Sequence, residues 1–173
     1  MLNPFQIFDL PVEFQLDEKA LNTHYLELQK ALHPDNFVSG SALEQRVAMQ
    51  KSTEVNDALK TLKDPILRAE AIIALNTGEQ IDLEQKSTQD VAFLMQQLQW
   101  REQLEELEDQ KNEEALNAFA KEIKQETQSL LTALSESLTS QQWTKASQQC
   151  DKLRFTRKLS EEIERVEERL FEL

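Results

Sequence analysis

The sequence has few of the residues that interrupt helices or cross-link a chain. Cys150 is its one cysteine, so the chain cannot form an internal disulfide, and a reducing compartment fits. The two glycines and four prolines all lie within the first 78 residues. Glycine and proline are the strongest breakers of regular structure, so the rest of the chain should form long helices. Few β-branched residues and no strict apolar–polar alternation argue against a sheet. These features together predict an all-α protein.

Basic segments and long apolar runs are also missing. The chain has 19 Lys and Arg against 32 Asp and Glu, a net charge of −13. The first 78 residues hold 7 against 11 and the remainder 12 against 21, so both parts are acidic. This argues against binding to nucleic acid or to an acidic membrane. We find neither a bilayer-spanning run nor a signal or transit segment, and we therefore expect a bacterial cytoplasmic protein.

The first 78 residues predict a helical hairpin between two short helices. Asp17 is a good N-cap for the first arm, and Ser41 with Glu44 fits a capping box for the second. The apolar stripes of the two arms are Leu21, Tyr25, Leu28 and Leu32, and then Ala48, Ser52, Val55, Leu59 and Leu62. Asn3-Pro4 and Asp64-Pro65 each resemble an N-cap followed by proline, which predicts the short helices.

The tripeptide His33-Pro34-Asp35 lies between the two stripes. Pro34 cannot continue a helix and disfavours helical backbone at His33, so the tripeptide begins a loop. There an imidazole and a carboxylate can reach a partner. A catalytic dyad is disfavoured, because residues two apart on a proline-containing loop are poorly placed to hydrogen-bond. No Ser or Cys nucleophile has a recognisable setting either. The other histidine, His24, falls on the polar side of its helix and is expected to be solvated.

The second part of the chain predicts three helices over residues 87–173, after a polar linker at 79–86. The core stripe of the first consists of Phe93, Trp100, Leu104 and Leu107. The second helix, about 113–138, has the stripe Leu116, Ala120, Ile123, Leu130, Leu134 and Leu138. The third begins near Ser140 and has two stripes that are out of phase. This helix therefore either bends or packs its halves on different partners.

The first of these three helices has a second apolar stripe, formed by Val91, Leu94, Met95 and Leu98. Further along, the same face carries Glu102, Glu105, Glu106 and Asp109. One interpretation is an exposed apolar patch for a protein client. The alternative is that the stripe packs on another helix of the bundle or on the first domain. Phe155 lies at the phase break of the third helix, where it is either exposed or partly buried.

The sequence resembles the HscB family of J-domain co-chaperones over nearly its whole length. A short helix, a hairpin with His33-Pro34-Asp35 at its bend and a third helix near Asp64-Pro65 are similar to a J domain. The HscB family is indicated by the segments Asn56–Leu59, Arg68–Glu70, Asp90–Met95, Arg101-Glu102 and Lys152–Phe155. The resemblance implies a J domain at 1–78 and a three-helix client-binding domain at 87–173.

The resemblance also implies partners and the residues that bind them. A DnaK-class, HscA-like chaperone would be engaged, and its ATPase stimulated, by Lys30, His33, Pro34, Asp35 and Asn36. An IscU-like iron–sulfur scaffold protein would be bound by Leu94, Met95, Leu98, Arg101, Glu102 and Phe155. Two features depart from the common J-domain pattern. Asn36 stands where many J domains have lysine, and the helix before the loop is nearly neutral rather than basic.

The residues predict no cofactor and no enzymatic activity. Two histidines and one cysteine give no ligand cluster at metal spacing, and no glycine-rich phosphate loop is present. The resemblance to the HscB family implies instead a regulator of a partner ATPase. Two alternatives remain open: a general J-domain co-chaperone with a different client, and a helical interaction module unrelated to chaperones in which the tripeptide is coincidental.

Overall fold

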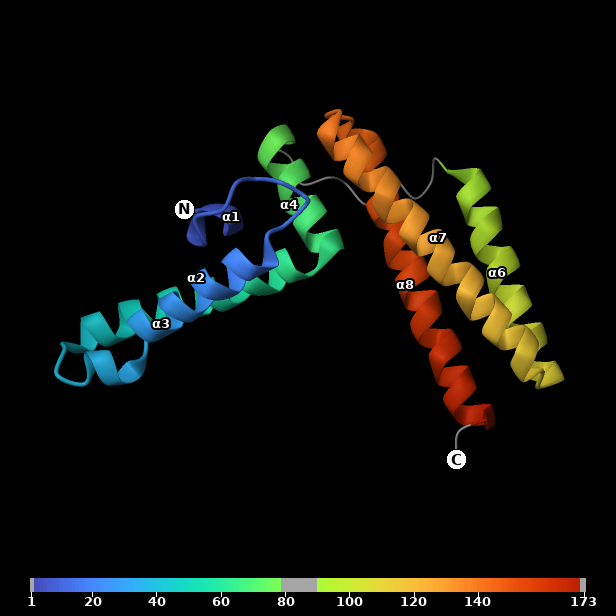
Figure 1. Cartoon of the computed structure of the whole chain (residues 1–173), viewed down its shortest axis with the longest axis horizontal. Coiled ribbons are helices and arrows are strands. Elements are labelled where there is room, and N and C mark those ends of the chain that lie inside the picture. Colours follow the sequence, from blue (N-terminus) through green and yellow to red (C-terminus); the bar gives the residue numbers. More distant parts are fainter. Residues whose placement is uncertain (1, 79–89, 172–173) are drawn as a thin grey trace. The chain divides into compact units, whose positions relative to one another are not determined.

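The computed structural model describes residues 2–78 and 90–171, and within these ranges all regular structure is helical (Figure 1). The all-α prediction is therefore confirmed. The chain divides into two compact units, Met1–Asn76 and Thr77–Leu173. The predicted linker, residues 79–86, lies outside the described residues. In the two described ranges, no helix combines the length and the apolar character that crossing a membrane requires.

The first unit is built on a hairpin of two helices. Its elements are α1 (Pro4–Ile7), α2 (Glu18–Ala31), the 3-10 turn η1 (Pro34–Phe37), α3 (Ala42–Lys63) and α4 (Pro65–Thr77). Helices α2 and α3 run side by side, and η1 lies at their bend (Figure 1). The predicted N-caps are present: Asp17 Oδ1 accepts from Ala20 N at 3.0 Å, and Ser41 Oγ accepts from Glu44 N at 3.1 Å.

The core of this unit confirms parts of the predicted stripes. It buries Phe5, Phe8, Leu21, Ala48, Val55, Ala58, Leu62, Ile66, Ala69, Ile72 and Ile73. Leu59 is only half-buried, and Ala58, which the pattern missed, takes the inner position beside it. The expectation of a solvated His24 is wrong. Its ring is half-buried and its Nδ1 is hydrogen-bonded to the carbonyl of Phe8, because the end of α1 lies against α2.

The second unit is a bundle of three helices, α6 (Val91–Gln110), α7 (Glu113–Thr139) and α8 (Trp143–Phe171). Helix α7 packs along α8, and α6 contacts both (Figure 1). One buried cluster joins all three helices and consists of Trp100, Leu104, Leu116, Phe119, Ile123, Leu159, Ile163 and Val166. Phe93 and Leu107, predicted as core, pack against this cluster at its edge and are partly buried.

Helix α8 is unbroken, although its two apolar stripes are out of phase. The later stripe, through Leu159 and Ile163, joins the three-helix cluster. The earlier stripe, through Cys150 and Leu153, is also buried but does not belong to that cluster. Thr156, fully buried between the stripes, donates to the Leu153 carbonyl at 3.2 Å. Both stripes are thus buried along one continuous helix, and only the later one belongs to the three-helix cluster.

Asp90 is the N-cap of α6 and connects its first turn to α8. Its Oδ1 accepts from Phe93 N at 2.9 Å, and its Oδ2 lies 3.4 Å from Lys152 Nζ on α8. The hydrogen bond from the Phe93 backbone lowers the pKa of the Asp90 carboxyl, and the positive charge of Lys152 adds to this effect. A carboxylate at this position satisfies one of the free amides of the first helical turn and also complements the helix dipole.

Replacing Asp90 by Ala should destabilise the second unit by about 0.5–2 kcal/mol, the usual cost of losing an N-cap. Asp90→Asn is the matched control, because asparagine keeps the cap and loses only the ion pair, so it should cost much less. Denaturant unfolding at neutral pH measures both, followed by the fluorescence of Trp100 and Trp143, the two tryptophans of the chain. Equal destabilisation by both variants would mean that the ion pair, and not the cap, is the important contact.

The same lowered pKa predicts how this contribution varies with pH. A carboxyl whose pKa is lower in the folded state stabilises the fold above its unfolded pKa. It loses that contribution as the pH falls through the folded value. The difference between the wild-type chain and Asp90→Ala should therefore be complete at neutral pH and shrink in acid.

Candidate functional site

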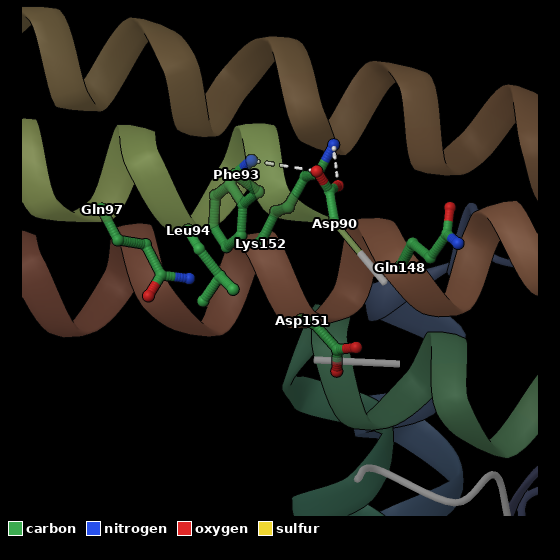
Figure 2. A pocket seen from close by; sticks show the side chains of 7 residues that line it. All are labelled: Asp90, Phe93, Leu94, Gln97, Gln148, Asp151 and Lys152. Atoms are coloured by element: carbon green, nitrogen blue, oxygen red, sulfur yellow. Dashed lines mark hydrogen bonds and ion pairs between the residues drawn. The ribbon is translucent and has the colours of Figure 1, made fainter. Parts of the chain in front are cut away.

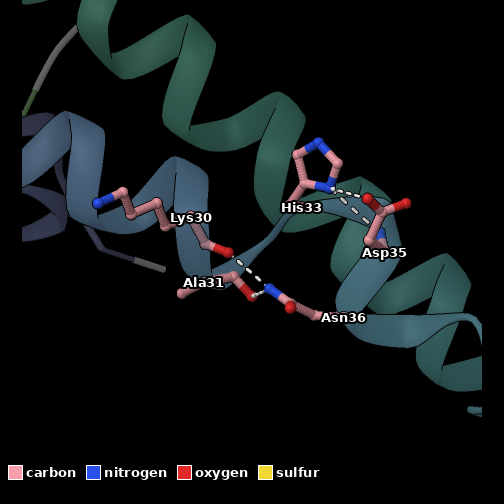
Figure 3. A network of polar contacts seen from close by, with 5 residues as sticks. All are labelled: Lys30, Ala31, His33, Asp35 and Asn36. Carbon is pink, nitrogen blue, oxygen red and sulfur yellow. Dashed lines mark hydrogen bonds and ion pairs between the residues drawn. The ribbon is translucent and has the colours of Figure 1, made fainter.

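The loop His33–Asn36 lies at the bend of the hairpin and is open to solvent. The side chains of His33 and Asp35 are 60% and 86% exposed. His33 Nδ1 accepts a hydrogen bond from Asp35 N at 3.2 Å, which places the proton of a neutral ring on Nε2. Figure 3 shows both side chains on the same side of the loop. The loop thus offers an N–H donor and a carboxylate to a partner.

The two side chains approach each other more closely than their sequence spacing suggested. His33 Nδ1 lies 3.6 Å from Asp35 Oδ2, which is an exposed ion-pair contact when the ring is charged, but too long for a hydrogen bond. Exposed pairs of this kind contribute little to stability. No group of three or more His, Cys, Asp or Glu residues in the described ranges is arranged to hold a metal ion.

Asn36 and Lys30 are placed differently from the tripeptide. Asn36 Nδ2 donates to the carbonyl oxygens of Lys30, at 2.6 Å, and Ala31, at 3.4 Å. In Figure 3 the Lys30 side chain points away from His33 and Asp35, so this residue meets the loop through its main chain. Sequence reasoning missed this contact. The available signal was the preference of asparagine for bonding to nearby backbone groups in turns.

An apolar groove adjoins the loop. It has a volume of about 450 Å³, and only uncharged residues line it: Leu32, Pro34, Phe37, Val38, Gln45, Ala48, Met49, Ser52 and Thr53. Pro34 and Phe37 belong to η1, and Gln45 Nε2 on α3 donates to the Phe37 carbonyl at 3.0 Å. The bend therefore presents both polar and apolar groups.

The second stripe of α6 is exposed. The exposed fractions are 63% for Val91, 41% for Leu94, 58% for Met95 and 63% for Leu98. The alternative that these residues pack on another helix of the bundle is therefore wrong. Phe93 and Trp100 occupy the side of α6 that faces the other helices, which leaves this stripe outside. We call these four residues the apolar patch.

Phe155 is partly buried at the edge of the bundle, as one of the two alternatives held. Its ring stacks on Trp100, with centroids 6.1 Å apart, and meets Phe93 edge-on at 5.8 Å. The Arg101 guanidinium lies 5.3 Å from the centre of the Phe155 ring and bonds to Glu162 at 3.1 Å. Arg101 thus covers the aromatic group, while Glu102 is exposed on the same helix.

A small notch lies between the start of α6 and α8, next to the apolar patch (Figure 2). It has a volume of about 80 Å³, and Leu94 of the patch forms part of its wall. Lys152 Nζ, paired with Asp90, lies 5.6 Å from the centre of the Phe93 ring. Sequence reasoning did not find the pair between Asp90 and Lys152, because the two residues are joined only by the packing of α6 on α8.

Comparison with known proteins places both units in one family. The family model described as the HSCB C-terminal oligomerisation domain matches residues 89–164. The co-chaperone protein HscB homologue of Haemophilus influenzae is 87% identical over 100% of this chain and 99% of its own. The HscB structure from Vibrio cholerae has a TM-score of 0.87 at 37% identity, covering 98% of this chain and 100% of that one.

Human HscB is also similar, with a TM-score of 0.86 at 27% identity over 95% of this chain and 81% of that one. These matches cover the hairpin with its exposed His33-Pro34-Asp35 as well as the bundle with its patch. The first unit is a J domain, the second is the C-terminal helical domain, and the chain belongs to the HscB family of co-chaperones.

Proposed function

We propose that this protein stimulates the ATPase of an HscA-like, DnaK-class chaperone and delivers an IscU-like iron–sulfur scaffold protein to it. The protein is then a regulator of a partner ATPase and not an enzyme. The observation that carries the proposal is the presence of two exposed surfaces on two separate units. The loop His33–Asn36 is on the J domain, and the apolar patch is on the bundle.

The loop is suited to the chaperone. A proline-bounded turn that exposes an imidazole N–H and a carboxylate can form charge-assisted hydrogen bonds at a protein interface. The adjoining groove is uncharged and offers apolar contact beside Pro34. In a chain with 29% charged residues, an uncharged groove next to the loop supports a role in binding.

The apolar patch is suited to the client. Leu94, Met95 and Leu98 form a contiguous apolar surface on rigid helix, rimmed by Arg101 and Glu102. Apolar anchors with a polar rim are the usual composition of a protein-binding surface. A different client of the same J-domain protein would use the same patch, and so would a second copy of this chain. Both are outcomes of the binding experiment below.

His33→Gln or Asp35→Asn should abolish ATPase stimulation and leave circular dichroism and the melting temperature nearly unchanged. The fold is spared because both side chains are exposed. Truncating one partner of a charged hydrogen bond at an interface costs about 2–5 kcal/mol, which brings stimulation close to baseline. ATPase rates of an HscA-type chaperone, measured with and without each variant, test this. Normal stimulation by both variants would disprove a role for the loop.

Association with the chaperone should depend only modestly on salt. Lys19 and Lys30 on α2 are offset by Glu18 and Glu27, so long-range attraction is weak. Between about 50 and 200 mM salt, we expect the association rate to change by roughly a few-fold in stopped-flow measurements. A change of about a hundredfold would mean that other cations, such as Arg46 and Lys51 on α3, steer the encounter.

Replacing Leu94, Met95 and Leu98 together by Ala should remove client binding without unfolding the bundle, because all three are exposed. Burying a large apolar side chain contributes about 1.5–3 kcal/mol. Losing about 4 kcal/mol in all would weaken a micromolar complex to the millimolar range. Calorimetric titration with an IscU-type scaffold measures the affinity, and a thermal melt measures the fold. Client-independent ATPase stimulation should be retained.

Leu26→Ala is the matched control, since Leu26 is 59% exposed and lies on the J domain. This variant should bind the client normally. Phe155→Ala belongs in a separate arm, because it also removes the aromatic packing on Trp100 and should lower the melting temperature. A folded triple variant that binds the scaffold normally would place the client elsewhere. If instead the triple substitution changes the self-association of the chain in light scattering, the patch joins copies of this protein.

A further inference from the structure

Asn36 is bonded to the end of α2 through its side chain and to His33, within the loop, through its backbone. Its Nδ2 donates to Lys30 O at 2.6 Å and to Ala31 O at 3.4 Å, and its backbone N–H donates to His33 O at 2.9 Å (Figure 3). The orientation of the amide follows from chemistry. Both neighbours are carbonyl oxygens, so the NH₂ end and not the oxygen of the side chain must face them.

These bonds close a ring around the tripeptide. The side-chain bond spans six residues, from Lys30 to Asn36, and the segment that it encloses contains His33, Pro34 and Asp35. The last carbonyls of a helix have no i+4 amide partner within the helix, so an amide donor helps to satisfy them. The Lys30 carbonyl also accepts a long bond from the His33 backbone N–H, at 3.5 Å. Because Pro34 already fixes one backbone torsion, the added tie leaves the tripeptide little freedom.

We propose that Asn36 is a positioning residue that pre-organises His33 and Asp35 for the chaperone instead of binding the chaperone itself. The inference rests on the proposed function, since it assumes that the loop is the chaperone-binding element. It revises the sequence-based expectation that Asn36 contacts the partner. The amide that would make such a contact is bonded to the chain's own backbone.

A positioning role and a direct-binding role for Asn36 predict different changes in the rate constants of chaperone binding. If the tie is lost, a smaller fraction of molecules has the binding conformation, and the apparent dissociation constant rises in inverse proportion to that fraction. The association rate then falls, while the bound complex and its dissociation rate stay the same. Loss of a direct contact acts mainly on the dissociation rate. Removing the tie should lower the competent fraction about five-fold, corresponding to the net worth of one hydrogen bond, about 1 kcal/mol.

The test compares the full-length wild-type chain with Asn36→Ala and Asn36→Asp. Asp has the same shape but cannot donate, and its charge is repelled by the two carbonyls. Asn36→Gln retains a donor. The control is Thr23→Val, which removes a similar exposed bond, from Thr23 Oγ1 to the Lys19 carbonyl at 2.9 Å, away from the loop on α2. Stopped-flow binding to an HscA-type chaperone gives both rate constants, and ATPase titration gives the plateau.

For Asn36→Ala and Asn36→Asp we expect an association rate about five-fold lower, with the dissociation rate and the stimulation plateau unchanged. Asn36→Gln should recover part of the loss, and Thr23→Val should match the wild type. In the free protein, the backbone amides of Asp35 and Asn36 should exchange with solvent faster in the Ala and Asp variants only.

A normal association rate in both variants would overturn the inference, and so would a faster dissociation rate with normal association. The wild-type arm tests the proposed function separately. If the wild-type chain does not stimulate the ATPase, it is the proposed function that fails.

Discussion

The contact of Phe155 on α8 with Trp100 and Phe93 on α6 decides how α6 is turned in the bundle. With the two α6 aromatic rings directed at α8, the core side of that helix is set. The stripe through Leu94, Met95 and Leu98 then lies outside the core of the bundle and is exposed. A helix with two apolar faces can bury only one of them against a single layer of neighbours. The apolar patch is therefore exposed because the aromatic contacts direct the opposite face of α6 toward the bundle.

Polar contacts at both ends of the aromatic group stabilise the same orientation of α6. Lys152 on α8 lies over Phe93 and pairs with Asp90 at the start of α6, and Arg101 lies over Phe155 and bonds to Glu162 on α8. Cations placed over ring faces add to the attraction and also shield the rings from water. Lys152 and Arg101, the cations beside the patch, thus stabilise the packing of α6 on α8. Their side chains are therefore less available for contacts with a client.

At the J domain, the corresponding constraint is Pro34, which ends the first arm of the hairpin. The chain then leaves the helix in a single 3-10 turn that is bonded to α2 through Asn36 and to α3 through Gln45. His33 and Asp35 are exposed on a segment held from both sides. Because each unit has its own buried core, the loop and the patch can be altered independently. In the proposed function, a partner ATPase and a client would be bound by different parts of one small protein.

Local patterns in the sequence predicted the elements well. Asp17 and Ser41 cap their helices, and the helix predicted at about 113–138 is α7, Glu113–Thr139. Caps and helix lengths depend on residues three or four positions apart in the chain. They can therefore be predicted from the sequence alone. Positions inside the stripes were less certain. Ala58 and Phe119 are buried although the patterns left them out, because helix–helix contact and not periodicity alone selects the inward residues.

The sequence by itself determined the all-α class, the exposed tripeptide and the existence of two apolar faces on α6, since proline geometry and helical spacing are local. Only the tertiary structure decided which face of α6 is buried, that both stripes of α8 are buried, and that the amide of Asn36 and the ring of His24 turn toward backbone carbonyls. Each of these depends on which group from a distant or returning segment comes within contact distance. That proximity is a property of the packed chain.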